Sequence, residues 1–185
     1  MAVLSNARLQ FFSSRRIPDR IWAEGDSYMA GAGGAGLSIT LRANGHVVIV
    51  GALGGSEITG TRARLIADAA LARKCLVLVW DGSQNGYVDA ESYTDILEAG
   101  LNAVAGNFVV IPAAVPFGTS NQTQQLAILA EFVARWPAKT YDWREDIANT
   151  GGVINEDRMF NYPTDTVHLN ATAMGEAYTG VSAFL

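Results

Sequence analysis

Short hydrophobic runs recur along the chain and are separated by longer segments of mixed polarity. Four runs are almost continuously apolar: Ile21–Glu24, Val47–Val50, Cys75–Trp80 and Phe108–Pro112. A short apolar run without polar alternation is typical of a strand that is covered on both faces, as in a parallel sheet. The pattern therefore predicts four parallel strands.

The segments between these runs place apolar residues at helical spacing. They predict helices over Arg62–Arg73, Ala90–Ala105 and Asn121–Trp136, and a last helix that begins near Asn170. Strands that alternate with helices predict an α/β fold: a three-layer α/β/α sandwich with a mostly parallel central sheet and right-handed crossovers. No linker is long enough to divide the chain, so we expect residues 1–185 to form a single domain.

The loops that follow the predicted strands hold most of the polar and glycine-rich motifs. These loops are Gly25–Ser27, Gly51–Gly55, Asp81–Gly86 and Pro112–Thr119. In an open parallel sheet, ligands bind beyond the carboxyl ends of the strands. The four loops should therefore lie on one rim of the sheet, and we expect a functional site there.

Composition narrows the choice of partners. The formal net charge is −5, and no run of Lys or Arg is longer than the Arg15-Arg16 pair. Nucleic-acid backbones and anionic membrane surfaces would gain no electrostatic attraction, so we expect no nucleic-acid partner. No apolar run has signal-peptide or membrane-spanning length, which predicts a soluble chain without a membrane span. The single cysteine, Cys75, can form no internal disulfide, and we expect a buried small hydrophobe there.

Two short motifs at opposite ends of the chain carry the candidate chemistry. Gly25, Asp26 and Ser27 follow the first predicted strand, and Asp165 and His168 lie near the end. A serine whose proton is taken by an imidazole, itself oriented by a carboxylate, is an activated nucleophile. A helix that starts at the serine would also point backbone N–H groups at a developing oxyanion. Each motif alone has a plainer interpretation, as an ordinary turn or a helix cap.

Together these motifs resemble the four sequence blocks of the SGNH or GDSL esterases. The first block, Gly-Asp-Ser after a hydrophobic strand, matches Gly25–Ser27, and the last, Asp-x-x-His before a small helix, matches Asp165–His168. The second block is a glycine after the second strand, where Gly55 is the best match and Gly54 a possible substitute. The third block, usually Gly-x-Asn-Asp, is replaced here by Gly82-Ser-Gln-Asn85.

The resemblance implies a flavodoxin-like fold and a role for each matched residue. Ser27 would be the nucleophile, His168 the general base and Asp165 its orienting partner, with no metal or organic cofactor. The backbone N–H groups of Ser27 and Gly55 would form part of an oxyanion hole. Asp26 would brace the loop and take no part in the reaction.

The third oxyanion donor and the substrate contacts are less closely defined by the motifs. By register the amide donor is Gln84, and a loop shift of one residue would make it Asn85. We favour Asn85, because its shorter side chain keeps the amide nearer the loop backbone, and both stay candidates. Tyr28 and Phe117 are candidate substrate contacts.

The implied activity is hydrolysis of an ester through an acyl-enzyme on Ser27. Because the chain has no long apolar lid, we expect a small acyl group, such as acetyl, on a carbohydrate or small ester. A broad carboxylesterase or thioesterase, or a lysophospholipase-like lipid esterase, is the alternative among enzymes. The alternative that is not an active enzyme is a catalytically weakened module that binds glycans or proteins. Similar domains occur in bacterial cells and on bacteriophages, and the oligomeric state stays open.

Other motifs imitate ligand-binding sites. Gly31–Gly36 reads as the G-x-G-x-x-G of dinucleotide sites but starts too late after its strand, so we expect a flexible or closely packed loop. Asp81–Gly86 resembles half a calcium loop, but the twelfth position is Ser92 and no bidentate glutamate. The only other histidine, His46, lies at the entry of the second strand, where we expect a surface or edge residue.

Overall fold

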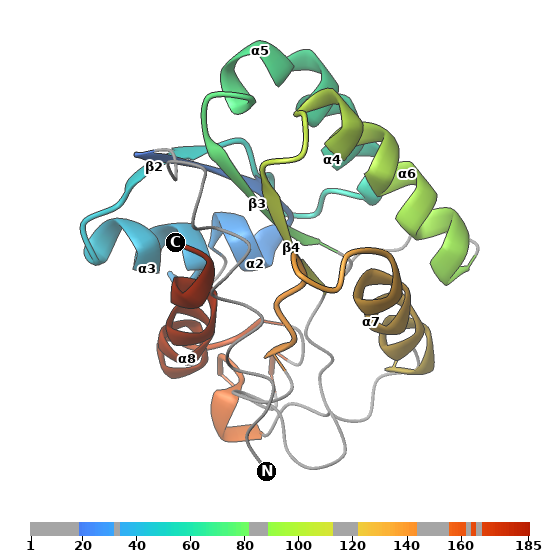
Figure 1. The fold of residues 1–185 in the computed structure, drawn as a ribbon. Helices are drawn as coiled ribbons and strands as arrows, with labels where there is room; N and C mark the ends of the chain where they lie inside the picture. Colours follow the sequence, from blue (N-terminus) through green and yellow to red (C-terminus); the bar gives the residue numbers. More distant parts are fainter. Residues whose placement is uncertain are drawn as a thin grey trace, which may run out of the picture.

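The computed structural model describes residues 19–31, 34–81, 89–112, 122–143, 156–161, 164–165 and 168–185. Four strands form one parallel sheet: β1 (Arg20–Gly25), β2 (Val47–Val50), β3 (Leu76–Asp81) and β4 (Phe108–Pro112). Their order across the sheet is β2-β1-β3-β4 (Figure 1). The four predicted strands are confirmed, with ends that differ by at most one residue.

The chain beyond β4 returns to the sheet and lies along its edge. The Val110 N–H donates to the Lys139 carbonyl oxygen over 2.8 Å, and the Tyr141 N–H donates to the Val110 carbonyl oxygen over 3.0 Å. These two bonds follow the pattern of a parallel ladder and put residues 139–141 in the position of a fifth strand. The resulting order of positions, 2-1-3-4-5, is that of flavodoxin-like sheets.

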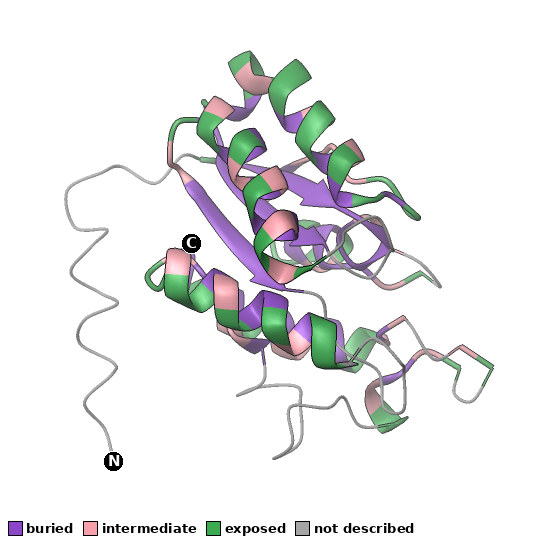
Figure 2. Ribbon diagram, turned by 90° about the vertical axis from the view of Figure 1, so that its right-hand side faces the viewer, coloured by how far each residue is buried: buried purple, intermediate pink, exposed green. Residues whose placement is uncertain are grey.

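Helices cover both faces of the sheet (Figures 1 and 2). One face carries α2 (Ser27–Ala30), α3 (Leu37–Ala43) and α8 (Ala171–Val181). The other carries α4 (Ile58–Ala67), α6 (Ala90–Ala103) and α7 (Gln122–Arg135). The shorter elements are α5 (Ala69–Ala72) and the 3-10 turns η2 (Glu156–Arg158) and η3 (Ser182–Phe184). The predicted three-layer α/β/α architecture is confirmed.

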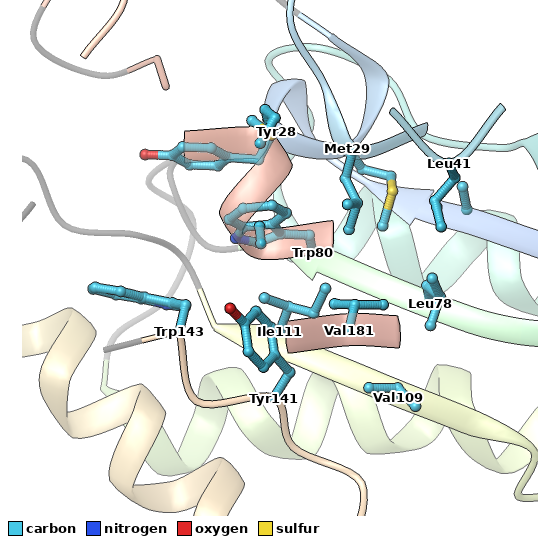
Figure 3. Packing of buried hydrophobic residues seen from close by; sticks show 14 of the residues in the cluster. Tyr28, Met29, Leu41, Leu78, Trp80, Val109, Ile111, Tyr141, Trp143 and Val181 are labelled. Atoms are coloured by element: carbon cyan, nitrogen blue, oxygen red, sulfur yellow. The ribbon is translucent and has the colours of Figure 1, made fainter. Parts of the chain in front are cut away.

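Buried strand residues alternate between two hydrophobic clusters, one on each face of the sheet. In β3, Trp80 belongs to the cluster under α3 and α8, whereas Val79 belongs to the cluster under α4 and α6. Figure 3 shows Trp80 beside Tyr28 of α2, and the two rings stack with their centroids 5.3 Å apart. Close packing therefore continues to the carboxyl end of β3, where the sheet meets the turn after β1.

The predicted helix over Arg62–Arg73 is wrong in its bounds. Helix α4 begins earlier and ends at Ala67, and Asp68 separates it from α5 (Ala69–Ala72). The Leu71 N–H donates to the Asp68 carbonyl oxygen, which starts a new turn and does not extend α4. This break rotates the apolar stripe, and Leu71 is left 42% exposed.

Helix α3 was not predicted from the sequence. Its N-cap is Gly36, which has no side chain to mark a helix start, and the helix has only 7 residues. Leu37 and Leu41, one turn apart, are fully buried on the α8 side of the sheet. A Cβ on Gly36 would lie 2.4 Å from the Gly31 Cα, so these two glycines permit a close backbone approach. The expectation of a closely packed glycine loop is thus confirmed at these two positions.

Candidate active site

Ser27 stands at the first position of α2, immediately after a sharp turn at the end of β1. Gly25 has φ +130°, and a Cβ there would lie 1.9 Å from the Trp80 carbonyl oxygen, so only glycine fits. The Asp26 N–H donates to that same oxygen over 3.1 Å. The Asp26 carboxylate accepts the Tyr28 N–H over 3.0 Å and caps α2. Asp26 therefore braces the turn that holds Ser27.

Asp165 and His168 lie on a loop that is closed at its base. Met159 and Leu169 form an antiparallel bridge across the two ends of this loop. Within it, Asn161 takes the left-handed conformation, with φ +55°, which asparagine tolerates better than most residues. The Asn161 carbonyl oxygen accepts the Asp165 N–H over 3.2 Å. These contacts fix the start of the loop and direct the Asp165 side chain back toward the imidazole.

The structure brings the serine, the imidazole and the carboxylate into one line of contacts. His168 Nε2 lies 3.1 Å from Ser27 Oγ, and His168 Nδ1 lies 2.7 Å from Asp165 Oδ2. The second Asp165 oxygen, Oδ1, accepts the His168 backbone N–H over 2.9 Å, which holds the carboxylate in place. When Nδ1–H donates to Asp165, Nε2 is left as an acceptor for the Ser27 hydroxyl.

The loop after β2 forms a tight turn beside Ser27. The Ser56 N–H donates to the Leu53 carbonyl oxygen over 3.0 Å, and Gly55 has φ +76°, as the inner position of such a turn requires. A Cβ on Gly54 would lie 3.9 Å from the Ser27 Cβ, whereas one on Gly55 would meet nothing within 4 Å. Within the described part of the chain, neither glycine N–H donates to a backbone or side-chain acceptor. The Cβ position of Gly54 is thus closer to Ser27 than that of Gly55, and neither N–H group is used by an acceptor in the described part of the chain.

The carboxyl end of β1 also holds a buried ion pair that was not predicted. Glu24 is 0% exposed, and its Oε1 lies 2.7 Å from Nη2 of Arg64, on α4. Burial raises the pKa of the Glu24 carboxyl above its ordinary value, and the charge of Arg64 opposes that rise. A glutamate that ends an apolar strand was a signal that a buried partner is needed, but nothing in the sequence identified Arg64 as that partner.

Of the four remaining residues that the sequence suggested for the site, the structure describes only Tyr28. Tyr28 is 1% exposed and belongs to the core, which argues against a substrate contact by its ring. Burial and the charges of Asp26 and Asp165 raise the pKa of the Tyr28 phenol well above its usual value. The other three, Gln84, Asn85 and Phe117, lie outside the described residues.

Asp81, His46 and Cys75, which the sequence analysis also considered, lie in other surroundings. Asp81 is buried, and one of its oxygens accepts the Tyr93 hydroxyl over 3.0 Å; the rest of its glycine-containing loop is outside the described residues. His46 is half-buried, with Nε2 3.2 Å from the Tyr178 hydroxyl, and Cys75 is fully buried. In the described part of the chain, no cluster of His, Cys, Asp or Glu could hold a metal ion. The same part contains no helix with the length and apolar character to cross a membrane.

Solved structures with the same fold include several hydrolases. A member of the lipolytic protein G-D-S-L family from Veillonella parvula is 14% identical with a TM-score of 0.68, and the match covers 88% of this chain and 96% of that one. The esterase EstA from a Pseudoalteromonas species, inhibited by monoethylphosphonate, is 19% identical with a TM-score of 0.63, covering 89% and 97%. A variant of the Geobacillus acetyl-xylooligosaccharide esterase Axe2 is 11% identical with a TM-score of 0.64, covering 92% and 95%.

Comparison by sequence finds no such similarity: no family model matches the chain, and no curated protein is significantly similar to it. The structural matches have low identity and near-complete coverage. They therefore establish that this chain has the α/β/α fold of the G-D-S-L hydrolases.

Proposed function

We propose that the protein is a serine esterase of the SGNH type. The observation that carries the proposal is the line of contacts from Ser27 through His168 to Asp165, at 3.1 Å and 2.7 Å. Ser27 and His168 are 141 residues apart in sequence, so their contact comes from the fold and has no local origin. Nucleophile and base within hydrogen-bond reach, with the base oriented by a third group, are the arrangement that acyl transfer needs.

In the proposed reaction, Ser27 Oγ attacks the ester carbonyl carbon while His168 Nε2 accepts the hydroxyl proton. The bond from that carbon to the alcohol oxygen then breaks, and His168 gives the proton to the leaving alcohol. A water molecule attacks the acyl-enzyme by the same route, which releases the carboxylic acid and restores Ser27. Asp165 keeps the proton on Nδ1, so that Nε2 faces the serine as an acceptor.

The developing oxyanion would be bound by N–H groups at the end of the sheet. The proposed donors are the Ser27 N–H, at the start of α2, the Gly55 N–H and the side-chain amide of Asn85 or Gln84. The Gly54 N–H joins them as a candidate because a Cβ on Gly54 would lie 3.9 Å from the Ser27 Cβ. Asn85→Ala and Gln84→Ala, compared side by side, should separate the two amides. Loss of the true donor lowers kcat about 10²–10³-fold, and equal small effects would remove both.

As substrate we propose an ester with a small acyl group, such as acetyl on a carbohydrate or small molecule. Two observations support this choice: the sequence has no long apolar lid segment, and one structural neighbour is an acetyl-xylooligosaccharide esterase. A broader carboxylesterase or lipid esterase is the second candidate, because another neighbour belongs to a lipolytic family.

The test is hydrolysis of p-nitrophenyl acetate and p-nitrophenyl octanoate by the wild type and by Ser27→Ala. We expect turnover that depends on Ser27 and favours the acetate ester. A preference for octanoate would select the lipid or general esterase. Labelling with a fluorophosphonate probe completes the experiment: labelling that survives Ser27→Ala contradicts this nucleophile. A folded wild type with neither turnover nor labelling would favour a binding module.

A further inference from the structure

The strongest feature outside the line of contacts is the polar cluster around Arg64, which we define as Glu24, Ser56, Arg64, Thr61 and Asp81. Glu24 and Asp81 are the last polar residues of the adjacent strands β1 and β3. Both carboxylates are almost fully buried, and the Thr61 hydroxyl bridges the cluster by donating to Asp81 and accepting from Arg64. The cluster therefore lies under the same sheet end that holds the candidate active site.

Arg64 uses all three of its nitrogen atoms in this cluster. Nε donates to Glu24 Oε1 over 2.8 Å, and Nη1 donates to Ser56 Oγ over 2.9 Å. Nη2 donates to the Gly25 carbonyl oxygen over 3.1 Å and to the Thr61 hydroxyl over 3.0 Å. These donors lie in one plane, because the guanidinium is rigid, so the distances between their acceptors are fixed by a single side chain.

Two of these acceptors belong to the two halves of the proposed oxyanion hole. The Gly25 carbonyl oxygen lies two residues before Ser27, and it also accepts the Leu53 N–H over 3.0 Å. Ser56 closes the turn that contains Gly54 and Gly55. Arg64 thus connects the turn that carries the Ser27 N–H to the turn that carries the glycine N–H groups.

We propose that Arg64 is a positioning residue that sets the spacing between the Ser27 N–H and the glycine N–H groups of the oxyanion hole. This inference rests on the proposed esterase function. Neither half of the hole is otherwise tied to the other by a side chain in the part of the chain that the structure describes. Backbone bonds from the Gly51, Ala52 and Leu53 N–H groups attach the start of this loop to β1, but the glycine turn that follows Leu53 makes no such bond to β1.

The space for this guanidinium is built into the neighbouring elements. A Cβ on Gly60 would lie 2.9 Å from Ser56 Oγ and 3.3 Å from Arg64 Nη1, and a Cβ on Gly51 would lie 2.4 Å from Glu24 Oε2. Side chains at both positions would therefore displace the cluster. Glu24 supplies the charge that holds Arg64 in place, with further bonds from the Trp22 ring N–H and the Gly25 N–H.

The test compares Arg64→Met, Arg64→Lys and Arg135→Met with the wild type. Arg135 is the matched control, because its side chain is also 23% exposed and pairs with carboxylates, but on α6 and α7. The measurements are kcat and KM for p-nitrophenyl acetate, and the inhibition constant of phenylboronic acid. The tetrahedral adduct of a boronic acid on serine places an oxygen in the oxyanion hole, so its affinity reports on that hole.

We expect Arg64→Met to lower kcat about 10²-fold and to raise the inhibition constant of phenylboronic acid by a similar factor. KM should stay close to that of the wild type. Arg64→Lys should keep more folding stability, because its charge still faces Glu24. It should recover little activity, since one ammonium cannot reach all four acceptors. Arg135→Met should leave kcat and the inhibition constant unchanged.

Ser56→Ala provides a milder variant should Arg64→Met fail to fold, because it removes one bond from Arg64 and the 3.2 Å bond from the Ser56 hydroxyl to the Glu57 carbonyl oxygen. We expect Ser56→Ala to raise the inhibition constant of phenylboronic acid and to lower kcat. Ser182→Ala, at an exposed serine on η3, is the control and should change neither. Folded Arg64→Lys and Ser56→Ala proteins with wild-type kcat and inhibition constant would overturn the proposal. A wild type without Ser27-dependent turnover would instead overturn the esterase function, and the positioning role with it.

Discussion

The two halves of the candidate active site are held in different ways. On the side of Ser27, this residue is 5% exposed and begins α2, just beyond the end of β1, where the fully buried Glu24 lies. On the base side, the His168 and Asp165 side chains are 27% and 25% exposed and lie on a surface loop. The first half is part of the core, and the second is a loop fastened to it. Changes to the first should therefore affect folding and chemistry together, whereas changes to the second should affect chemistry more than folding.

The contacts that attach the loop of Asp165 and His168 to the rest of the protein lie at the surface. Arg158, just before the loop, donates to both oxygens of Glu176 on α8 over 2.7 Å. Asn170, just after it, donates to the carbonyl oxygens of Asp157 and Met159. These bonds join the two ends of the loop and attach them to α8. Solvent screens such pairs, so they contribute less to stability than the buried pair of the other half.

The largest expected effect is a loss of kcat, and it should be the same for the two halves of the site. Ser27→Ala and His168→Ala should each lower kcat about 10⁴–10⁶-fold, and the double variant should fall little further, because the three residues act as a unit. Steady-state kinetics on p-nitrophenyl acetate measure this directly. Fully additive losses would show that Ser27 and His168 act independently and would contradict the proposed mechanism.

The next prediction separates the halves by their stability. Arg64→Met leaves Glu24 buried without its partner and should lower the free energy of unfolding by about 3–5 kcal/mol. Arg158→Met removes a partly exposed pair and should cost about 0.2–1 kcal/mol. Urea unfolding of the two variants at pH 7 gives both numbers. Equal losses would show that the two halves of the site are held with similar strength.

The pH dependence sharpens the same contrast. Burial raises the pKa of the Glu24 carboxyl in the folded protein above its unfolded value, so ionisation of Glu24 lowers stability as pH rises through the folded pKa. Without Arg64 this pKa rises further, because only burial and hydrogen bonds remain. The destabilisation caused by Arg64→Met should therefore be large at pH 7 and smaller near pH 5. Urea titrations at the two pH values test this, with Arg158→Met, which should show no such recovery, as the control.

The last prediction concerns Asn170, at the end of the loop of Asp165 and His168. The Asn170 side chain accepts the Ala173 N–H, which caps α8, and Asn170→Ala should cost about 0.5–2 kcal/mol. Asn170→Asp keeps the cap acceptor but loses the donated bonds to Asp157 and Met159. Aspartate should thus restore most of the stability measured by urea unfolding and only part of kcat. Full recovery of kcat would show that the cap alone positions His168.

The sequence predicted the elements whose signal is local. Apolar runs marked all four strands, and Asn170 followed by a small-residue helix marked the start of α8. Helix α3 gave no such signal, since a glycine N-cap looks like any other loop glycine. The break at Asp68 was missed because helical spacing alone does not show where one helix stops and another begins.

The same limit applies to the candidate site. Ser27, Asp165 and His168 were found because each lies in a short motif. The Glu24–Arg64 pair was not, because its members are 40 residues apart and meet only after α4 crosses over β1. The proximity of Gly54 to Ser27 likewise depends on a turn geometry that two consecutive glycines leave open.

The distance of 141 residues between Ser27 and His168 also has a consequence for how the protein is made. A ribosome releases the proposed nucleophile early and the proposed base late. A nascent chain that has emerged only as far as α7 already contains Ser27, but it lacks His168, which is proposed to take the proton. Because α8 packs against α3 on the same face of the sheet, His168 reaches Ser27 only when α8 docks. Hydrolytic activity would therefore report that synthesis and folding have proceeded through α8, and chains that stall before it would be silent.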